Sequence, residues 1–138
     1  MRVVIAGCGR VGAALAVQLV NAGHHVTVID QNSQAFSRLP DNFPGKTLVG
    51  TGIDEDVLRK AGAEHADAFA AVMTGDNRNL MAAQVAMYTF HIKSVVARIY
   101  DPLRAEIFRK LGVRTMCPTV LGANLIAEGL VQSPVPAN

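Results

Sequence analysis

The sequence contains no tryptophan, and its aromatic residues make up only 5% of the chain. It has two cysteines, Cys8 and Cys117, which are too few for the disulfide framework of a small secreted domain, so a reducing cytosolic compartment is favoured. Against these scarcities stand 12 glycines and an apolar content of 50%. Many small residues and few aromatic ones favour helices packed closely on a sheet over an aromatic-rich β-sandwich.

The chain also has little net charge: the formal net charge is only +2, and no run of basic residues occurs. Surfaces that bind nucleic acid need clustered Lys and Arg, so we predict no nucleic-acid partner. No apolar stretch approaches the roughly 20 residues that a membrane-spanning helix needs. The chain begins directly with a strand-like run and lacks the pattern of a signal peptide. We therefore expect a cytoplasmic protein that does not insert into a membrane.

At 138 residues the chain is long enough for one domain with its own core. Short runs that are apolar on both faces are typical of central parallel strands, and here they alternate with helical patterns. Strands are expected at residues 3–6, 26–30, 47–49, 69–73 and 95–100, and helices at residues 11–22, 34–39, 55–61, 79–90, 102–111 and 120–131. This alternation predicts an α/β fold, a Rossmann-type doubly wound parallel sheet with helices on both faces. The domain should span residues 1–132, and the proline-bearing residues 133–138 should form a disordered tail.

The last predicted helix, at residues 120–131, carries very little polar surface. Asn124, Glu128 and Gln132 are spaced four apart and form one narrow polar stripe, whereas nearly all the other residues are apolar. An apolar terminal helix has to be covered, either by its own domain or by a second subunit. We favour the second subunit and predict an apolar crossover or dimer helix.

A glycine-rich loop follows the first strand and opens the first helix. It reads Gly7-Cys8-Gly9-Arg10-Val11-Gly12. In such a loop the first glycine permits the tight turn, the second lets backbone approach phosphates, and the third lets the helix pack closely on the strand. The helix N-terminus adds free N–H groups and a partial positive charge. The glycine pattern alone is weak evidence, but its position between strand and helix predicts a phosphate-binding loop.

The second predicted strand ends in Asp30, eighteen residues past Gly12. A carboxylate at this position can accept hydrogen bonds from ribose hydroxyls and would repel a 2′-phosphate, so NADP is disfavoured. The alternative is a solvated carboxylate that caps the segment at Asn32. Arg10 has two interpretations as well: it neutralises a phosphate chain such as that of ADP or ATP, or it is an exposed first-turn arginine.

The sequence resembles the N-lobe of the RCK (KTN, or TrkA-N) family, the cytosolic regulators of potassium channels and transporters. Besides the loop and Asp30, the resemblance rests on residues 50–58 (GTGIDEDVL) and 74–79 (TGDNRN), on residues 96–99 (VARI) with Asp101-Pro102, and on residues 111–113 (LGV) leading to Cys117-Pro118. Any one of these motifs is unspecific, whereas their order and spacing together are specific for the family. The resemblance covers residues 1 to about 131.

The resemblance implies roles for further residues. Gly50, Thr51 and Gly52 would recognise adenine through backbone groups, and Thr74, Asp76 and Asn79 would border the phosphates. The candidate binding residues are Gly7, Cys8, Gly9, Arg10, Val11, Gly12, Asp30, Gln31, Gly50, Thr51, Gly52, Thr74, Gly75, Asp76, Asn79 and Arg98.

Arg98 would contact the phosphate region or a partner subunit, and an edge or interface salt bridge is its alternative. Many relatives have an acidic residue where Thr51 stands, so adenine selectivity is the weaker part of the assignment. Relatives with a divalent cation at the subunit interface often have an acidic residue where this chain has Thr119, so no metal site is predicted.

The resemblance implies a cytoplasmic, non-enzymatic regulatory subunit or domain, peripheral to the membrane through its partner. It would form a homodimer or higher homo-oligomer and gate a potassium channel or transporter in response to an adenine nucleotide. Arg10 favours ATP, ADP or AMP, and NAD or NADH is the alternative ligand. A fragment of an NAD-dependent oxidoreductase is a rival class, but no catalytic residue is predicted because no nucleophile–base pair or substrate domain is evident. A redox-responsive transcription regulator is less favoured, since no DNA-binding element is visible.

Overall fold

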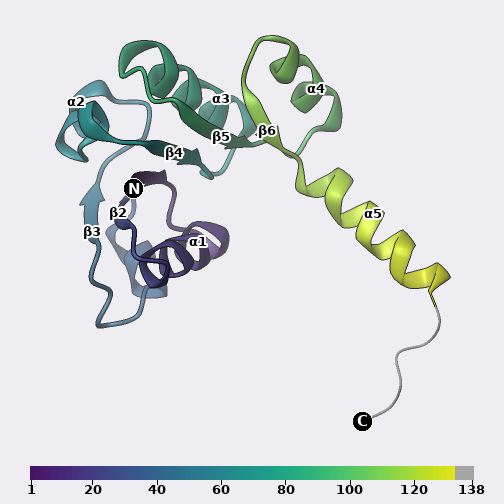
Figure 1. Cartoon of the computed structure of the whole chain (residues 1–138), viewed down its shortest axis with the longest axis horizontal. Coiled ribbons are helices and arrows are strands. Elements are labelled where there is room, and N and C mark those ends of the chain that lie inside the picture. The colour runs from purple at the N-terminus through teal and green to yellow at the C-terminus, as the bar shows by residue number, and fades with distance from the viewer. Residues whose placement is uncertain (133–138) are drawn as a thin grey trace.

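A computed structural model describes residues 1–132, which form one parallel sheet with helices on both faces (Figure 1). The strands are β1 (Arg2–Ala6), β2 (His25–Asp30), β3 (Lys46–Val49), β4 (Ala68–Ala71), β5 (Ser94–Arg98) and β6 (Arg114–Met116). The α-helices are α1 (Arg10–Asn21), α2 (Glu55–Lys60), α3 (Asp76–Gln84), α4 (Pro102–Lys110) and α5 (Pro118–Val131). Two short 3-10 helices, η1 (Ser33–Arg38) and η2 (Ala63–His65), and one π-helical turn, η3 (Val85–Thr89), complete the described part of the chain.

The six strands lie in the order β3-β2-β1-β4-β5-β6, and every neighbouring pair is parallel. The chain first winds outward from β1 to β3, then returns to β4 beside β1 and winds outward in the other direction. The strand order therefore reverses between β1 and β4. In an open α/β sheet, ligands bind outside the carboxyl ends of the strands at this reversal. The doubly wound Rossmann fold predicted from the sequence is confirmed.

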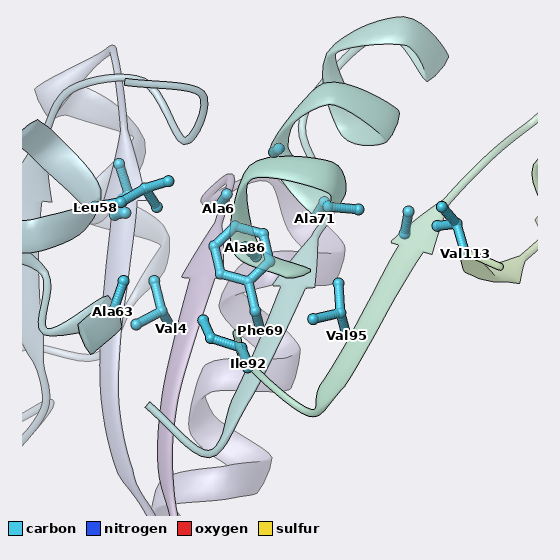
Figure 2. Packing of buried hydrophobic residues seen from close by; sticks show 14 of the residues in the cluster. Val4, Ala6, Leu58, Ala63, Phe69, Ala71, Ala86, Ile92, Val95 and Val113 are labelled. Carbon is cyan, nitrogen blue, oxygen red and sulfur yellow. The ribbon is translucent and has the colours of Figure 1, made fainter. Parts of the chain in front are cut away.

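Alternate residues of the strands point to two separate cores. On one face, Val3 and Ile5 of β1 pack with Ala13 and Ala16 of α1. On the other face, the larger core joins the strands to α2, α3 and α4 (Figure 2). Its largest fully buried side chain is that of Phe69. Because both faces of the sheet centre are buried, β4 is apolar throughout and β1 is apolar after Arg2, as the sequence pattern indicated.

Three elements differ from the sequence-based expectation. The strand β6 was not predicted, because its three residues include Arg114 and Thr115 and show no apolar run. The segment predicted as a helix at residues 34–39 is the 3-10 helix η1, and the helix predicted at residues 79–90 begins earlier, at Asp76, and ends in a π-helical turn. The predicted tail at residues 133–138 lies outside the described residues.

The helix α5 does not cover its own domain. It projects away from the sheet (Figure 1), and none of its residues is buried. Its apolar side chains are strongly exposed, with Leu130 at 80% and Ile126 at 66%. In the structure, α5 therefore does not pack on its own domain, which was one of the two alternatives for this helix.

Candidate functional site

The glycine loop turns sharply between β1 and α1. Gly7 has a φ of +111°, a conformation that L side chains rarely adopt, and a Cβ there would lie 2.6 Å from the carbonyl oxygen of Val72. A Cβ on Gly12 would overlap the carbonyl oxygen of Gly7. The loop therefore requires glycine at both positions, which lets α1 pack against the end of β4.

The first turn of α1 is free of competing groups. Its N-cap residue, Gly9, makes no side-chain capping bond, and the first turn holds no acidic residue. Gly9 is exposed, and nothing lies within 4 Å of the place where its Cβ would be. Unpaired N–H groups at a helix N-terminus form a binding site for anions.

Asp30, at the end of β2, lies directly against this loop. Its Oδ2 accepts a hydrogen bond of 2.8 Å from the backbone N–H of Cys8, and its Oδ1 accepts one of 2.8 Å from the N–H of Asn32. The backbone carbonyl of Asp30 accepts a hydrogen bond of 3.0 Å from the N–H of Gly50. The glycine loop, Asp30 and Gly50 are thus brought together at one edge of the sheet.

An open cavity of about 610 Å³ lies at this edge, at the reversal of the strand order. Ten of the predicted residues line it: Gly7, Cys8, Gly9, Arg10, Val11, Asp30, Gln31, Gly50, Thr74 and Arg98. The carboxyl ends of β1, β2, β4 and β5 and the N-terminus of α1 all contribute to its wall.

Arg98 is a buried cation in the wall of this cavity, with only 9% of its surface exposed. Its Nη2 donates to the carbonyl oxygens of Val72 and Met73, both at 3.2 Å, and its guanidinium lies 5.0 Å from the centre of the Tyr100 ring. Its Nε has no hydrogen-bond partner, and no carboxylate of residues 1–132 forms an ion pair with it. The salt bridge considered for Arg98 is therefore absent within this part of the chain.

Comparison with known proteins identifies the family of this chain. The family model of the TrkA-N domain matches residues 3–118. The chain belongs to the TrkA-N domain family.

A curated relative of this TrkA-N domain is a Trk system potassium uptake protein TrkA from Streptomyces coelicolor. It is 47% identical over 137 residues, which are 99% of this chain and 60% of the relative. The chain therefore spans less than two thirds of the length of that relative.

Two solved structures share the fold. The TrkA-N domain of the inner membrane protein ybaL from Escherichia coli has a TM-score of 0.82 at 17% identity, over 95% of this chain and 96% of that chain. A Kef CTD from Shewanella denitrificans in AMP-bound form has a TM-score of 0.77 at 25% identity, over 94% of this chain and 80% of that chain.

Two residues of the TrkA-N domain that were expected to border the phosphates have their side chains engaged elsewhere. Asn79 has no exposed surface: its side chain accepts from the N–H of Met73 at 2.7 Å and donates to the carbonyl oxygens of Met73 and Arg98, both at 2.9 Å. Asp76 accepts from the N–H groups of Tyr100 and Asp101 at 2.8 and 3.0 Å. Both side chains hold the strand ends that form the cavity and do not line it.

The glycine turn after β3 is only partly in the cavity. Gly50 lines it, whereas Thr51 and Gly52 do not. Gly52 is buried because it lies against β1, where a Cβ would be 2.5 Å from the Cβ of Ala6. Gly75, with a φ of +105°, caps the N-terminus of α3, and Gly12 lies behind the loop.

Cys8, although it lies in the loop, is held as a thiol. Burial raises the pKa of the Cys8 thiol, the Asp30 carboxylate raises it further, and the Arg38 guanidinium partly opposes both. The sulfur donates only a weak contact of 3.5 Å to the carbonyl oxygen of Ala35. A protonated, buried thiol is a poor nucleophile, so Cys8 acts as a small filler of the core.

Two cationic side chains of the cavity were missed by the sequence analysis. Arg38 of η1 and Arg78 of α3 both line it. Arg38 lies on a 3-10 helix eight residues after Asp30, where no motif marks it. Arg78 lies within the quoted segment at residues 74–79, but its role depends on which face of α3 points to the cavity.

Within residues 1–132, no group of three or more His, Cys, Asp and Glu side chains is placed to hold a metal ion. Thr119 donates instead to the carbonyl oxygen of Tyr100 at 2.7 Å. None of the helices in these residues is long and apolar enough to cross a membrane.

Proposed function

We propose that this TrkA-N domain is the nucleotide-sensing part of a cytoplasmic regulatory subunit, which gates a potassium channel or transporter in the membrane. The proposed ligand is an adenine nucleotide, with ATP, ADP or AMP favoured over NAD or NADH. The name of the Streptomyces relative, a Trk system potassium uptake protein, supports the potassium assignment.

The observation that carries the nucleotide assignment is the buried guanidinium of Arg98. A buried cation without a carboxylate partner is costly, and an anionic ligand in the adjoining cavity would supply the missing charge. The free N–H groups at the start of α1 face the same cavity, and Asp30 is placed for ribose hydroxyls. A nucleotide requires groups that bind its phosphates and a group that accepts hydrogen bonds from its ribose. Arg98 and the start of α1 would serve the phosphates, and Asp30 would serve the ribose.

Adenosine phosphates are favoured over NAD for two reasons. Arg10 is exposed, lines the cavity and forms no ion pair within residues 1–132, so its charge is available to a phosphate chain. The Kef CTD with the same fold was solved with AMP bound. NAD carries only two phosphate charges, so the charge of Arg10 favours ATP and ADP over NAD, whereas the preference for AMP rests on the Kef CTD alone.

An enzymatic role has less support. A dehydrogenase needs a substrate-binding region and an acid or base beside the nicotinamide. The cavity in residues 1–132 contains one carboxylate, Asp30, and both of its oxygens accept backbone hydrogen bonds. A sensor needs only differential binding: the nucleotide must bind one arrangement of subunits more tightly than another.

Replacing Arg10 with alanine tests the assignment of the phosphate chain. We expect calorimetry on the full chain to rank ATP and ADP above NAD and NADH. The Arg10→Ala variant should lose about tenfold in affinity for ATP, because one charge-assisted hydrogen bond contributes roughly 1.5 kcal/mol or more. Its affinity for AMP should change less than twofold or so, since AMP has no chain beyond the loop.

If NAD or NADH binds best and Arg10→Ala leaves every affinity unchanged, the ligand is a dinucleotide and the role of Arg10 is wrong. If no adenine nucleotide binds, the sensing function itself is wrong. An Arg104→Ala variant is the control, because Arg104 is an exposed arginine of α4 that does not line the cavity.

The proposed function includes a homodimer or higher homo-oligomer built on α5. This helix exposes apolar side chains that its own domain leaves uncovered, namely those of Val120, Leu121, Leu125, Ile126, Leu130 and Val131. A second copy of the chain carries the same apolar surface, so a two-fold arrangement would cover both helices at once. Nucleotide binding in the cavity could then favour one arrangement of the two copies.

A single charge on the apolar side of α5 should break this association. For Ile126→Asp we expect sedimentation equilibrium to show a dissociation constant at least about tenfold weaker than that of the wild type, because a buried carboxylate would be desolvated. The control Asn124→Asp places the same charge two residues away on the polar stripe and should leave the assembly intact. A wild-type chain that is monomeric at all concentrations would contradict the assignment of α5.

A further inference from the structure

The cavity contains more positive charge than a phosphate chain alone requires. Among residues 1–132, four arginines line it, Arg10, Arg38, Arg78 and Arg98, and Asp30 is the one carboxylate that does so. None of the four arginines forms an ion pair among residues 1–132. The phosphate-binding loop, Arg98 and Arg10 account for the 5′-phosphates, so Arg38 and Arg78 need a reason of their own.

Arg38 lies on the ribose side of the loop. Its Nη1 donates a long hydrogen bond of 3.4 Å to the carbonyl oxygen of Cys8, the residue whose N–H binds Asp30. Asp30 and Arg38 therefore both contact the backbone of Cys8, the first at its N–H and the second at its carbonyl oxygen. The long bond to Cys8 leaves most of the donors of the Arg38 guanidinium available.

Arg38 and Arg10 also share a second hollow. A shallow groove on the outer face of α1 is lined by both arginines, and both line the nucleotide cavity as well. Arg10 and Arg38 therefore lie where the cavity and this groove meet. Arg98, by contrast, lies at the end of β5, beside β4, and does not line this groove. The cavity thus has an inner cationic position at Arg98 and an outer one at Arg38.

The negative charge of Asp30 is partly neutralised by its own hydrogen bonds. Each of its oxygens accepts a backbone N–H, from Cys8 and from Asn32. Hydrogen bonds of this kind stabilise the carboxylate and reduce the field it exerts on a neighbouring anion. The expectation that NADP is disfavoured considered Asp30 alone and did not include Arg38.

We propose that Arg38 is a specificity-determining residue that binds a phosphate on the adenosine ribose, so that the site accepts 2′-phosphorylated adenine nucleotides. In Rossmann-type sites a carboxylate at this position binds the ribose 2′-hydroxyl, whereas a nearby arginine accommodates a 2′-phosphate, and this site has both kinds of residue. Arg10 adds positive potential from the other side of the opening. This inference rests on the proposed adenine-nucleotide site and extends it to a ligand class carrying phosphate at both ends of the ribose.

The test compares 2′,5′-ADP with 5′-AMP by calorimetry on the full chain. The two ligands share adenine, ribose and the 5′-phosphate, and they differ only in the 2′-phosphate. We expect 2′,5′-ADP to bind about tenfold more tightly, as one bidentate arginine–phosphate contact should provide. Arg38→Ala should remove this advantage and change the affinity for 5′-AMP by less than about twofold.

Two variants separate a specific contact from a general loss of charge. Arg78→Ala removes another arginine from the cavity wall, on α3, and should lower the affinities for both ligands alike if it lowers either. Arg38→Lys keeps the charge but loses the bidentate geometry, so it should retain only a minor share of the preference. Melting temperatures of all variants identify any that fails to fold.

The outcomes are distinct from those that test the proposed function. If 5′-AMP binds and 2′,5′-ADP binds no more tightly, the role of Arg38 is wrong while the nucleotide site stands. The role of Arg38 is equally wrong if Arg38→Ala weakens the binding of both ligands by the same factor. If neither ligand nor ATP binds, the nucleotide site itself is wrong.

Discussion

Replacing Arg98 with methionine is expected to weaken 5′-AMP binding by about a hundredfold. In the proposed complex, the guanidinium would donate charge-assisted hydrogen bonds to the phosphate from a buried position, and each such bond contributes roughly 1.5–3 kcal/mol. A loss of about 2.7 kcal/mol corresponds to that hundredfold change. Methionine has a similar length and no charge, so the wall of the cavity stays filled. Calorimetry with AMP gives the measurement.

The same substitution should leave the unliganded protein about as stable as the wild type. Arg98 donates to the carbonyl oxygens of Val72 and Met73, and these bonds would be lost. However, a buried charge without a carboxylate partner would also be removed, and replacing buried ionic groups by apolar ones is often neutral or stabilising. The substitution should therefore weaken AMP binding but change the free energy of unfolding by less than about 1 kcal/mol.

A loss of AMP affinity without a loss of stability would identify Arg98 as a ligand-binding arginine. Arg114→Met is the matched control, because Arg114 is an exposed arginine on the neighbouring strand β6 and does not line the cavity. It should change neither quantity. An Arg98→Met protein that binds AMP as tightly as the wild type, or that unfolds without ligand, would show that the guanidinium serves the fold.

The parts of the site that depend on short contiguous motifs could be predicted from the sequence. The glycine loop and Asp30 lie at the ends of strongly apolar strands, and parallel strands place their carboxyl ends at one edge of the sheet. Sequence order alone brings them together once the βαβ unit is recognised. The strand β6 was missed for the converse reason: three residues with a charged member become a strand only because they pair with β5.

Side-chain roles at the far side of the cavity depended on packing that the sequence does not encode locally. Asp76 and Asn79 were assigned to the phosphates by resemblance, and the structure uses both to bind backbone groups of neighbouring loops. No sequence motif marks Arg38, because its position depends on where the second turn of the 3-10 helix η1 lies in the fold. Backbone groups beyond a strand end need partners, and only the tertiary structure shows which side chain supplies them.

Asn79 should therefore be one of the most sensitive positions for stability. In Asn79→Leu, a side chain of similar size, three hydrogen bonds disappear and the N–H of Met73 and the carbonyl of Arg98 lose their Asn79 partner. Each buried polar group left unpaired costs roughly 1–3 kcal/mol, so the free energy of unfolding should fall by about 2–5 kcal/mol. Urea denaturation followed by circular dichroism gives the measurement.

The position of Asn79 makes the loss larger than that of an ordinary hydrogen bond. Its amide joins the ends of β4 and β5 from the first turn of α3, so three elements depend on one side chain. Asn77→Leu is the control on the same helix: Asn77 is exposed, and the substitution should change stability by less than about 0.5 kcal/mol. Asn79→Asp keeps an acceptor for the N–H of Met73 but would place a negative charge against two carbonyl oxygens, and it should be destabilised as well. Equal stabilities for Asn79→Leu and Asn77→Leu would mean that water replaces the lost amide, and that the strand ends of the cavity are held by the sheet alone.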